Sequence, residues 1–245
     1  MSARSALQRG YVLHARPYRE TSLLVDCLTI ENGRISLVAK GARTGKAAQR
    51  RLLQPFAPLL ISYLGQGELH TLTAVEEAGT GRRLIGERLA CGLYLNELLM
   101  YLLPRGEAVE ELFAFYNRAL DALASDEAVS PLLRRFELNL LEAMGVAPNW
   151  AVETSSGDAI VAGQSYALTS DGPVYPAALS RDAGLVDGES LQALAQGSPE
   201  SPHVLAQTKR ILRYFIHLHL GGRELKSREL LRGPVALGAD NKDNL

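Results

Sequence analysis

Cysteine is scarce in this sequence, and the two cysteines that it contains do not form a site. Cys27 and Cys91 lie far apart in apolar segments, so they form neither a metal-binding motif nor a disulfide framework, and we expect two buried thiols. The chain also has no apolar run of the roughly 20 residues that crosses a bilayer. Its first residues carry charges throughout and do not resemble a secretory signal. We therefore expect a cytoplasmic protein with no membrane partner.

Catalytic signatures are absent as well. The sequence has no Walker-type phosphate loop, no glycine-rich dinucleotide fingerprint and no G-x-S-x-G elbow. His217 and His219 stand two residues apart in a predicted helix, so they point to different faces and cannot hold one metal together. Glu110 and Glu111 are adjacent rather than facing, which suits a solvated helix end better than an acid–base pair. We expect no enzyme, no cofactor and no metal.

What is present begins with short strands. Runs rich in apolar and β-branched residues cover five segments, residues 10–18, 21–30, 34–42, 56–65 and 68–78. Asn32 and Gly33 separate the second run from the third, and this pair favours a hairpin because both residues tolerate positive φ. Five strands without a long intervening helix predict a small closed barrel of the oligonucleotide-binding (OB) type over residues 1–80.

Helical periodicity then takes over. Apolar residues recur at helical spacing in residues 83–103, 108–124 and 130–145, and again in 187–196 and 201–222. Ser130 followed by Pro131, and Ser201 followed by Pro202, predict two helix starts, and Gly221 predicts a helix end. We predict a helical domain over residues 81–146 plus 188–235.

The remaining segment, residues 147–187, is rich in Ser, Gly, Asp and Pro and shows only short β-like pieces. We expect a small irregular insert there. The predicted fold class is therefore α+β, with an N-terminal five-stranded OB-type barrel followed by a mainly α-helical domain that carries this insert.

Charge is the most informative property of the chain. The formal net charge is only −1, yet the cations gather in two places. The first cluster comprises Arg34, Lys40, Arg43, Lys46, Arg50 and Arg51. The second comprises Lys209, Arg210, Arg213, Arg223, Lys226, Arg228 and Arg232. Either cluster could be a solvated face. Because the first joins strands of a predicted OB barrel, we interpret it as a DNA-binding surface that neutralises phosphates. The second is a candidate additional basic surface.

Four barrel aromatics, Tyr11, Tyr18, Phe56 and Tyr63, are available either for the core or for stacking on bases.

The order of several motifs resembles a known family. "VLHARPYRETSLLVDCLTIENGRISLVAKGAR" is followed by "LQPFAPL", "GLYLNELL", "LLRRFELNLLEAMG" and finally "LGGRELKSRELL". This series is similar to the RecO family of bacterial DNA repair and recombination mediators, and the similarity covers most of the chain. It is weakest over about residues 150–200.

The resemblance implies several activities without catalytic turnover. Family members bind single- and double-stranded DNA and anneal complementary strands. They work with RecR to load RecA on strands covered by single-strand-binding protein, which implies a nucleoid-associated location. Many relatives carry a four-cysteine zinc ribbon after the "LLEAMG" helix. No cysteine occurs in residues 147–176 here, so we expect hydrogen bonds and local packing in place of zinc.

The resemblance also implies a second partner site. In this family the acidic C-terminal tail of single-strand-binding protein docks on the helical domain, and the matching positions lie in "LLRRFE". Arg134 and Arg135 are the candidate partners of tail carboxylates, and Leu132, Leu133 and Phe136 are candidates for an apolar slot. Alternatively, one arginine bridges to Glu137 or Glu142. We favour Arg134 for the partner.

The hypothesis is a DNA-repair mediator of the RecF pathway. One alternative is an interaction adaptor whose basic loop meets an acidic protein, and another is an enzyme with an unrecognised site. Salt-dependent oligonucleotide binding distinguishes the first two.

Overall fold

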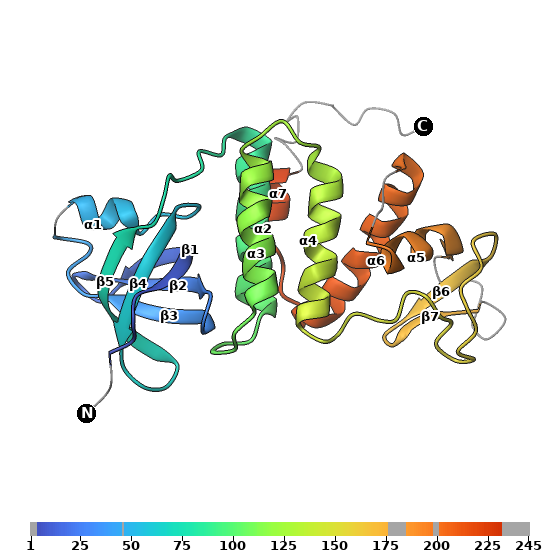
Figure 1. The fold of residues 1–245 in the computed structure, drawn as a ribbon, viewed down its shortest axis with the longest axis horizontal. Helices are drawn as coiled ribbons and strands as arrows, with labels where there is room; N and C mark the ends of the chain where they lie inside the picture. The colour runs from blue at the N-terminus through green and yellow to red at the C-terminus, as the bar shows by residue number, and fades with distance from the viewer. Residues whose placement is uncertain (1–3, 46, 176–184, 198–200, 232–245) are drawn as a thin grey trace, which may run out of the picture.

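The computed structural model describes residues 4–45, 47–175, 185–197 and 201–231 of the chain. A β-barrel forms one end of the elongated molecule, a group of helices forms the middle, and a small sheet lies at the far end (Figure 1). None of the helices in this described part combines the length and the apolar character needed to cross a membrane.

The N-terminal unit is a closed five-stranded barrel, which confirms the predicted fold class. Its strands are β1 (Gln8–Tyr18), β2 (Ser22–Thr29), β3 (Gly33–Ala39), β4 (Pro58–Leu64) and β5 (Leu69–Glu77). They pair in the order β1-β2-β3-β5-β4, and β1 also pairs with β4, so no edge is left open. Only the β3–β5 pair is parallel. The barrel interior is filled by alternating side chains of the strands, among them Leu23, Val25, Cys27, Ile35 and Leu37.

The predicted hairpin at Asn32 and Gly33 is confirmed. Strands β2 and β3 pair from Thr29 and Gly33 onward, and Gly33 has a φ of 55°. A Cβ atom at this position would lie 1.8 Å from the carbonyl oxygen of Glu107. The glycine therefore permits both the turn and the close approach of the helical domain.

We expected the basic stretch between β3 and β4 to be a loop, but part of it is helical. Residues Ala47–Leu52 form the short helix α1, which lies at the barrel end of the molecule (Figure 1). Its sequence, AAQRRL, consists of residues with high helix propensity, which explains the local structure.

The middle of the molecule is built from α2 (Gly86–Leu102), α3 (Glu110–Leu123), α4 (Val129–Ala143) and α6 (Pro202–Leu220). The short helix α7 (Ser227–Leu231) packs on α2 (Figure 1). Cys91 of α2 lies buried and free in this helical core, and Cys27 is buried and free in the barrel, as predicted.

The helix ends bear out one capping prediction and correct another. The Ser201 side chain accepts a hydrogen bond from the Val204 backbone N–H at 3.2 Å, and Gly221 ends α6 in the left-handed conformation. The predicted start at Ser130 is wrong, because α4 begins at Val129 after an extended Ala128. Val129 packs against the helical core, so tertiary contact draws it into the helix.

The barrel and the helices share one hydrophobic core. Tyr11 and Leu13 of β1 and Leu28 of β2 pack with residues of the helices in a single cluster. The Asn96 side chain of α2 donates to the Leu13 carbonyl at 2.9 Å and accepts from the Tyr116 hydroxyl at 2.6 Å. Polar as well as apolar contacts therefore fix the barrel against the helices.

The insert contains β6 (Ser165–Thr169), β7 (Gly172–Val174) and β8 (Val186–Asp187), paired in the order β7-β6-β8, and α5 (Gly188–Ala195) follows. Glu153 organises the chain before this sheet. Its carboxylate accepts hydrogen bonds from the backbone N–H groups of Ser156 at 2.6 Å and Tyr175 at 3.1 Å. These bonds tie together two segments that are distant in sequence.

Candidate nucleic-acid interface and cationic pocket

The outer face of strands β1, β2 and β3 is divided into a covered half and a free half. Directly opposite residues of neighbouring strands share a face of the sheet. One cross-strand row, Tyr11–Leu28–Arg34, is packed under the helical domain. A later row, Arg16–Leu24–Val38, is exposed or partly exposed. Position along the strands therefore decides whether a cation on this face is available to a ligand.

The free half carries cations and one aromatic ring. Arg16 is exposed on β1, and Lys40 is exposed directly after β3. In the turn after β1, the Arg19 guanidinium lies 5.2 Å from the centre of the partly exposed Tyr18 ring. Sequence reasoning assigned no role to Arg16 and Arg19, although the two-residue alternation of His14, Arg16 and Tyr18 was a signal that these side chains face outward.

Arg43 joins the basic loop to the turn between β1 and β2. Its Nη1 atom donates to the carbonyl oxygens of Arg19 at 2.8 Å and Glu20 at 3.1 Å. Its backbone N–H donates to the Thr21 carbonyl at 2.9 Å. Arg43 thereby positions this turn while its own charge remains exposed.

The other members of the predicted DNA-binding set have different environments. Arg50 and Arg51 are exposed at the end of α1. Lys46 lies outside the described residues. Arg34 belongs to the covered half, where its Nε donates to the Leu103 carbonyl at 2.8 Å. Burial and the neighbouring Arg105 lower the pKa of the Arg34 guanidinium, which indicates that it is enclosed rather than presented to solvent.

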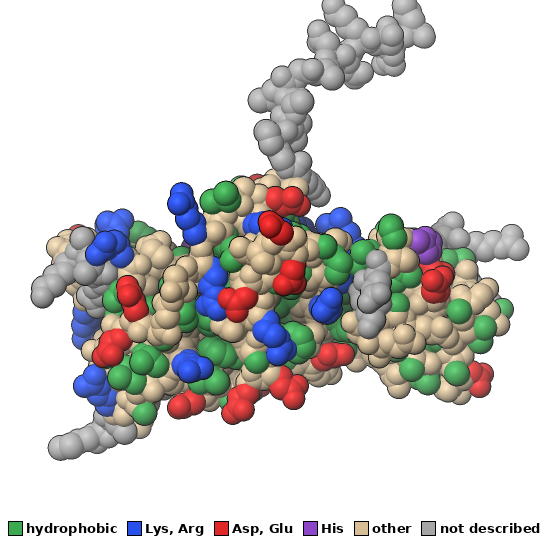
Figure 2. All heavy atoms as spheres, turned by 45° about the horizontal axis from the view of Figure 1, so that its top comes forward, with side chains coloured by type: hydrophobic (Ala, Val, Ile, Leu, Met, Phe, Trp, Pro, Cys, Tyr) green, Lys and Arg blue, Asp and Glu red, His purple; other side chains and the backbone are tan. Residues whose placement is uncertain are grey.

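The exposed barrel cations are not neutralised within the described part of the chain. Among the described residues, Arg16, Arg19, Lys40, Arg50 and Arg51 form no ion pair with a carboxylate. Figure 2 shows Lys and Arg side chains over the barrel and the central helices, whereas the opposite end shows none on this face. Residues 147–180 indeed contain no lysine or arginine. Among the described residues, the lysines and arginines therefore lie in the barrel and the helical domain.

A second cationic site is a pocket of about 380 Å³ within the helical domain. Four cations from three helices line it, namely Arg134, Lys209, Arg213 and Arg228. One carboxylate, Glu87, also lines it, together with the apolar side chains of Val129, Leu133 and Leu231. The structure thus brings Arg134 of the predicted partner site together with three members of the C-terminal basic cluster.

Arg134 is buried at this pocket and only partly satisfied. Its Nη2 atom lies 2.7 Å from Oε1 of Glu137, and the Tyr94 hydroxyl donates to the same oxygen at 2.7 Å. Among the described residues, Arg134 Nε and Nη1 find no hydrogen-bond partner. The bridge to Glu137 that sequence reasoning kept as an alternative therefore exists, yet it leaves donors of Arg134 unused.

The cations of the pocket repel one another. Repulsion from Arg213, followed by burial, lowers the pKa of the Lys209 ammonium. Burial, followed by repulsion from Arg228 and Arg134, lowers the pKa of the Arg213 guanidinium. Within the described residues, Arg228 Nε and Nη2 are also buried without a partner. An anionic group placed here would relieve this repulsion and satisfy these donors.

The remaining candidates lie outside the pocket. Phe136 is buried in the core beside Tyr116, and Leu132 packs partly buried against that core. Arg135, Arg210 and Lys226 are exposed, and none of them lines the pocket. Arg232 lies outside the described residues.

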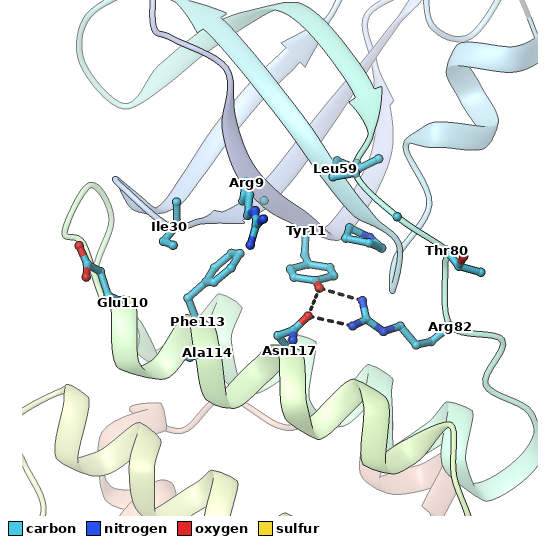
Figure 3. A pocket seen from close by; sticks show the side chains of 14 residues that line it. Arg9, Tyr11, Ile30, Leu59, Thr80, Arg82, Glu110, Phe113, Ala114 and Asn117 are labelled. Atoms are coloured by element: carbon cyan, nitrogen blue, oxygen red, sulfur yellow. Dashed lines mark hydrogen bonds between the residues drawn. The ribbon is translucent and has the colours of Figure 1, made fainter.

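A further pocket of about 420 Å³ lies between the barrel and α3. Figure 3 shows Phe113 and Arg9 on one side of it and a hydrogen-bonded group of Tyr11, Asn117 and Arg82 on the other. Arg82 donates to the Tyr11 hydroxyl, to Asn117 and to Asp121, each at 2.8 Å. Since these bonds occupy all three guanidinium nitrogens, Arg82 fastens the barrel to α3.

The described residues contain no group of three or more His, Cys, Asp or Glu side chains placed to hold a metal ion. In the insert, the Glu153 carboxylate makes the cross-links that we expected hydrogen bonds to provide.

Comparison with known proteins agrees with both halves of this architecture. The family model described as Recombination protein O N terminal matches residues 1–80, and the model described as Recombination protein O C terminal matches residues 83–229. A curated protein from Methylococcus capsulatus, named DNA repair protein RecO, is 46% identical over 230 residues, which cover 94% of each chain. Proteins of the same name from Nitrosococcus oceani and Pseudomonas aeruginosa are 44% and 43% identical, over 96% and 92% of this chain and 96% and 94% of their own.

A closed OB-type barrel fused to a helical body, with both parts matching recombination-protein models, defines a DNA repair protein. The chain belongs to the RecO family.

Proposed function

We propose that this protein is a recombination mediator. It binds single- and double-stranded DNA on the free half of the barrel face and anneals complementary strands. With RecR, it helps load RecA on strands covered by single-strand-binding protein, in the cytoplasm at the nucleoid. The observation that carries the proposal is the set of exposed barrel cations that form no ion pair among the described residues.

The proposed DNA path follows general OB-fold geometry. OB barrels bind single strands on the face of strands 2 and 3, between the loops that join strands 1 to 2 and 4 to 5. Here Lys40 directly follows β3, Arg16 lies on β1 opposite Leu24 of β2, and the first of these loops carries Arg19. Tyr18 is placed to stack on a base beside a phosphate held by Arg19.

Annealing on such a surface needs no bond-making residue. Two complementary strands repel each other through their phosphates, and cations that neutralise both strands remove this repulsion while base pairing drives the reaction. The proposed activity is therefore a binding function and not a catalytic one.

The cationic pocket is the proposed site for the acidic tail of single-strand-binding protein. Tail carboxylates would bind the unused donors of Arg134 and the side chains of Lys209, Arg213 and Arg228. The apolar wall of the pocket, which includes Leu133, suits an apolar residue next to those carboxylates. Because the pocket and the barrel face belong to one body, the protein could hold the tail and the DNA together.

DNA binding is tested by fluorescence titration of a single-stranded oligonucleotide at several salt concentrations. The variant Lys40→Glu/Arg51→Glu should bind less tightly, and its slope of log affinity against log salt should flatten by about 0.7 per lost phosphate contact. Arg118→Glu/Arg135→Glu is the matched control, since both residues are exposed cations of the helical domain. An unchanged slope in the double variant would contradict the assigned surface.

Tail binding is tested with two neighbouring residues of α6. Both side chains are exposed, but Lys209 lines the pocket whereas Arg210 does not. Lys209→Glu should weaken binding of an acidic peptide that ends in an apolar residue, by about tenfold or more, and Arg210→Glu should not. Equal affinities of these two variants would contradict the assignment. If oligonucleotides do not bind and an acidic protein does, the adaptor hypothesis replaces the mediator hypothesis.

A further inference from the structure

Helix α7 supplies one wall of the cationic pocket from a short segment near the described end of the chain. It comprises only the five residues Ser227–Leu231, and Arg228 and Leu231 line the pocket. Helices much shorter than about 12 residues have little stability of their own. The position of Arg228 must therefore be held by contacts with the rest of the protein.

Glu97 of α2 provides the polar part of this attachment. Its Oε1 atom accepts a hydrogen bond from the Lys226 backbone N–H at 2.9 Å, and its Oε2 atom accepts from the Ser227 backbone N–H at 2.9 Å. The Ser227 hydroxyl also donates to Oε2, at 2.5 Å. A charged acceptor strengthens such bonds. One carboxylate thus fixes the first turn of α7.

The apolar part of the attachment involves two leucines. Leu225 is buried in the helical core immediately before this turn, and Leu231 packs against the core only partly buried. Arg228 itself has two guanidinium nitrogens without a partner among the described residues, so no hydrogen bond from those atoms holds it in place. The carboxylate of Glu97 is therefore the main polar anchor of the segment that carries Arg228.

We infer that Glu97 is a positioning residue for the cationic pocket. Glu97 does not line the pocket, and its negative charge alone would disfavour an acidic ligand. By holding α7 on α2, however, it keeps Arg228 beside Arg134 and Arg213. The inference rests on the proposed binding of an acidic peptide in this pocket, and it predicts that removing a negative charge weakens that binding.

Two possible roles of Glu97 predict opposite effects on peptide binding when its charge is removed. If Glu97 acted only through long-range electrostatics, Glu97→Gln would bind an anionic peptide more tightly. If Glu97 acts through Arg228, Glu97→Gln should bind less tightly, because the amide can offer only one acceptor oxygen where the carboxylate offers two. The sign of the change therefore separates the two mechanisms.

The experiment measures binding of a fluorescent peptide that carries several aspartates and an apolar C-terminal residue with a free carboxylate. We expect Glu97→Gln to weaken binding about fivefold and Arg228→Ala to weaken it about tenfold. The double variant should bind no more weakly than Arg228→Ala alone, because coupled residues are not additive. Glu224→Gln is the control, since it removes the same charge from an exposed residue just before α7.

Several outcomes would overturn the inference. Unchanged or tighter binding by Glu97→Gln would do so, and so would a double variant whose loss equals the product of the two single losses. If the unaltered protein does not bind the peptide, the proposed pocket function fails and the inference fails with it.

Oligonucleotide binding at the barrel should be unchanged in every variant, which verifies folding. Should Glu97→Gln fail this check, Ser227→Ala removes only the hydroxyl bond and should weaken peptide binding about twofold, whereas unaltered affinity would refute the inference.

Discussion

Glu137 and Arg134 form an ion pair inside the helical domain, with 2.7 Å between Oε1 of Glu137 and Nη2 of Arg134. The exposed fraction is 4% for the Arg134 side chain and 0% for that of Glu137. Charges withdrawn from water in this way are costly unless their geometry is complete, and here Oε2 of Glu137 has no partner among the described residues. The pair is therefore incompletely satisfied, and we expect its contribution to stability to depend on pH.

The first prediction concerns the pH dependence of stability. Burial raises the pKa of the Glu137 carboxyl, against the opposing effects of Arg134 and the Tyr94 hydroxyl. The folded protein then holds this proton more tightly than the unfolded chain, whose pKa is about 4.3. The contribution of Glu137 to the free energy of unfolding is thus fully present below that value and falls as pH rises towards the raised pKa.

Urea unfolding at a series of pH values checks this prediction. The variant Glu137→Gln does not titrate, so its free energy of unfolding should lack this fall with pH. The control Glu224→Gln should follow the unaltered protein. A constant difference between Glu137→Gln and the unaltered protein at every pH would contradict the prediction.

The second prediction concerns Glu153, whose pKa is shifted in the opposite direction. The hydrogen bond from the Ser156 backbone lowers the pKa of the Glu153 carboxyl to about 2, with a further contribution from the Tyr175 backbone. The Glu153 carboxylate should therefore stabilise the insert fully above the ordinary Glu pKa of about 4.3. This stabilisation should be lost as pH falls towards the lowered pKa.

Hydrogen exchange of the Ser156 and Tyr175 amides reports this effect locally. Glu153→Gln should speed exchange at both amides near neutral pH, and Asp158→Asn, a charge-matched change in the same segment, should not. Equal protection of these amides in Glu153→Gln and the unaltered protein would show that the carboxylate does not organise the insert.

The third prediction compares two glycines that both have positive φ. Gly33 has a φ of 55° and Gly41 a φ of 70°, but a Cβ would meet the Glu107 carbonyl at Gly33 and nothing within 4 Å at Gly41. Gly41→Ala should cost about 1–2 kcal/mol from backbone strain alone. Gly33→Ala adds overpacking and should cost roughly 2–5 kcal/mol. Urea unfolding measures both, and equal costs would show that the approach of Glu107 is readily relaxed.

The fourth prediction concerns Asn96 at the junction of barrel and helices. Asn96→Ala leaves the Leu13 carbonyl and the Tyr116 hydroxyl without their partner, which should cost roughly 2–5 kcal/mol because both groups are buried. Asn139→Ala is the control, since among the described residues that side chain bonds only to the Arg135 carbonyl within its own helix. A loss below about 0.5 kcal/mol for Asn96→Ala would indicate that water replaces both bonds.

Local chemistry explains which parts of the fold were predictable from the sequence. The Asn32–Gly33 turn and the Ser201 cap depend on neighbouring residues only, so their signals are visible without tertiary structure. The start of α4 was mispredicted because packing of Val129 on the core outweighed the capping preference of Ser130. The helix in residues 47–52 was missed because charge, rather than helix propensity, was considered there.

The functional surfaces depend more strongly on tertiary structure. Nothing in the sequence around Arg34 reveals that Leu103 lies over it. The cationic pocket combines residues of α4, α6 and α7, and only the fold brings Arg134 near Arg213 and Arg228. Sequence reasoning identified these cations as separate groups and could not see that they share one pocket.

The core shared by β1, β2 and the helices limits how this protein can be dissected. Tyr11, Leu13 and Leu28 belong to barrel strands but are buried among helical residues. A fragment that stops at residue 80, where the N-terminal family model ends, would uncover all three and tend to self-associate. We therefore expect the isolated barrel to differ from the full chain in self-association and in affinity for DNA.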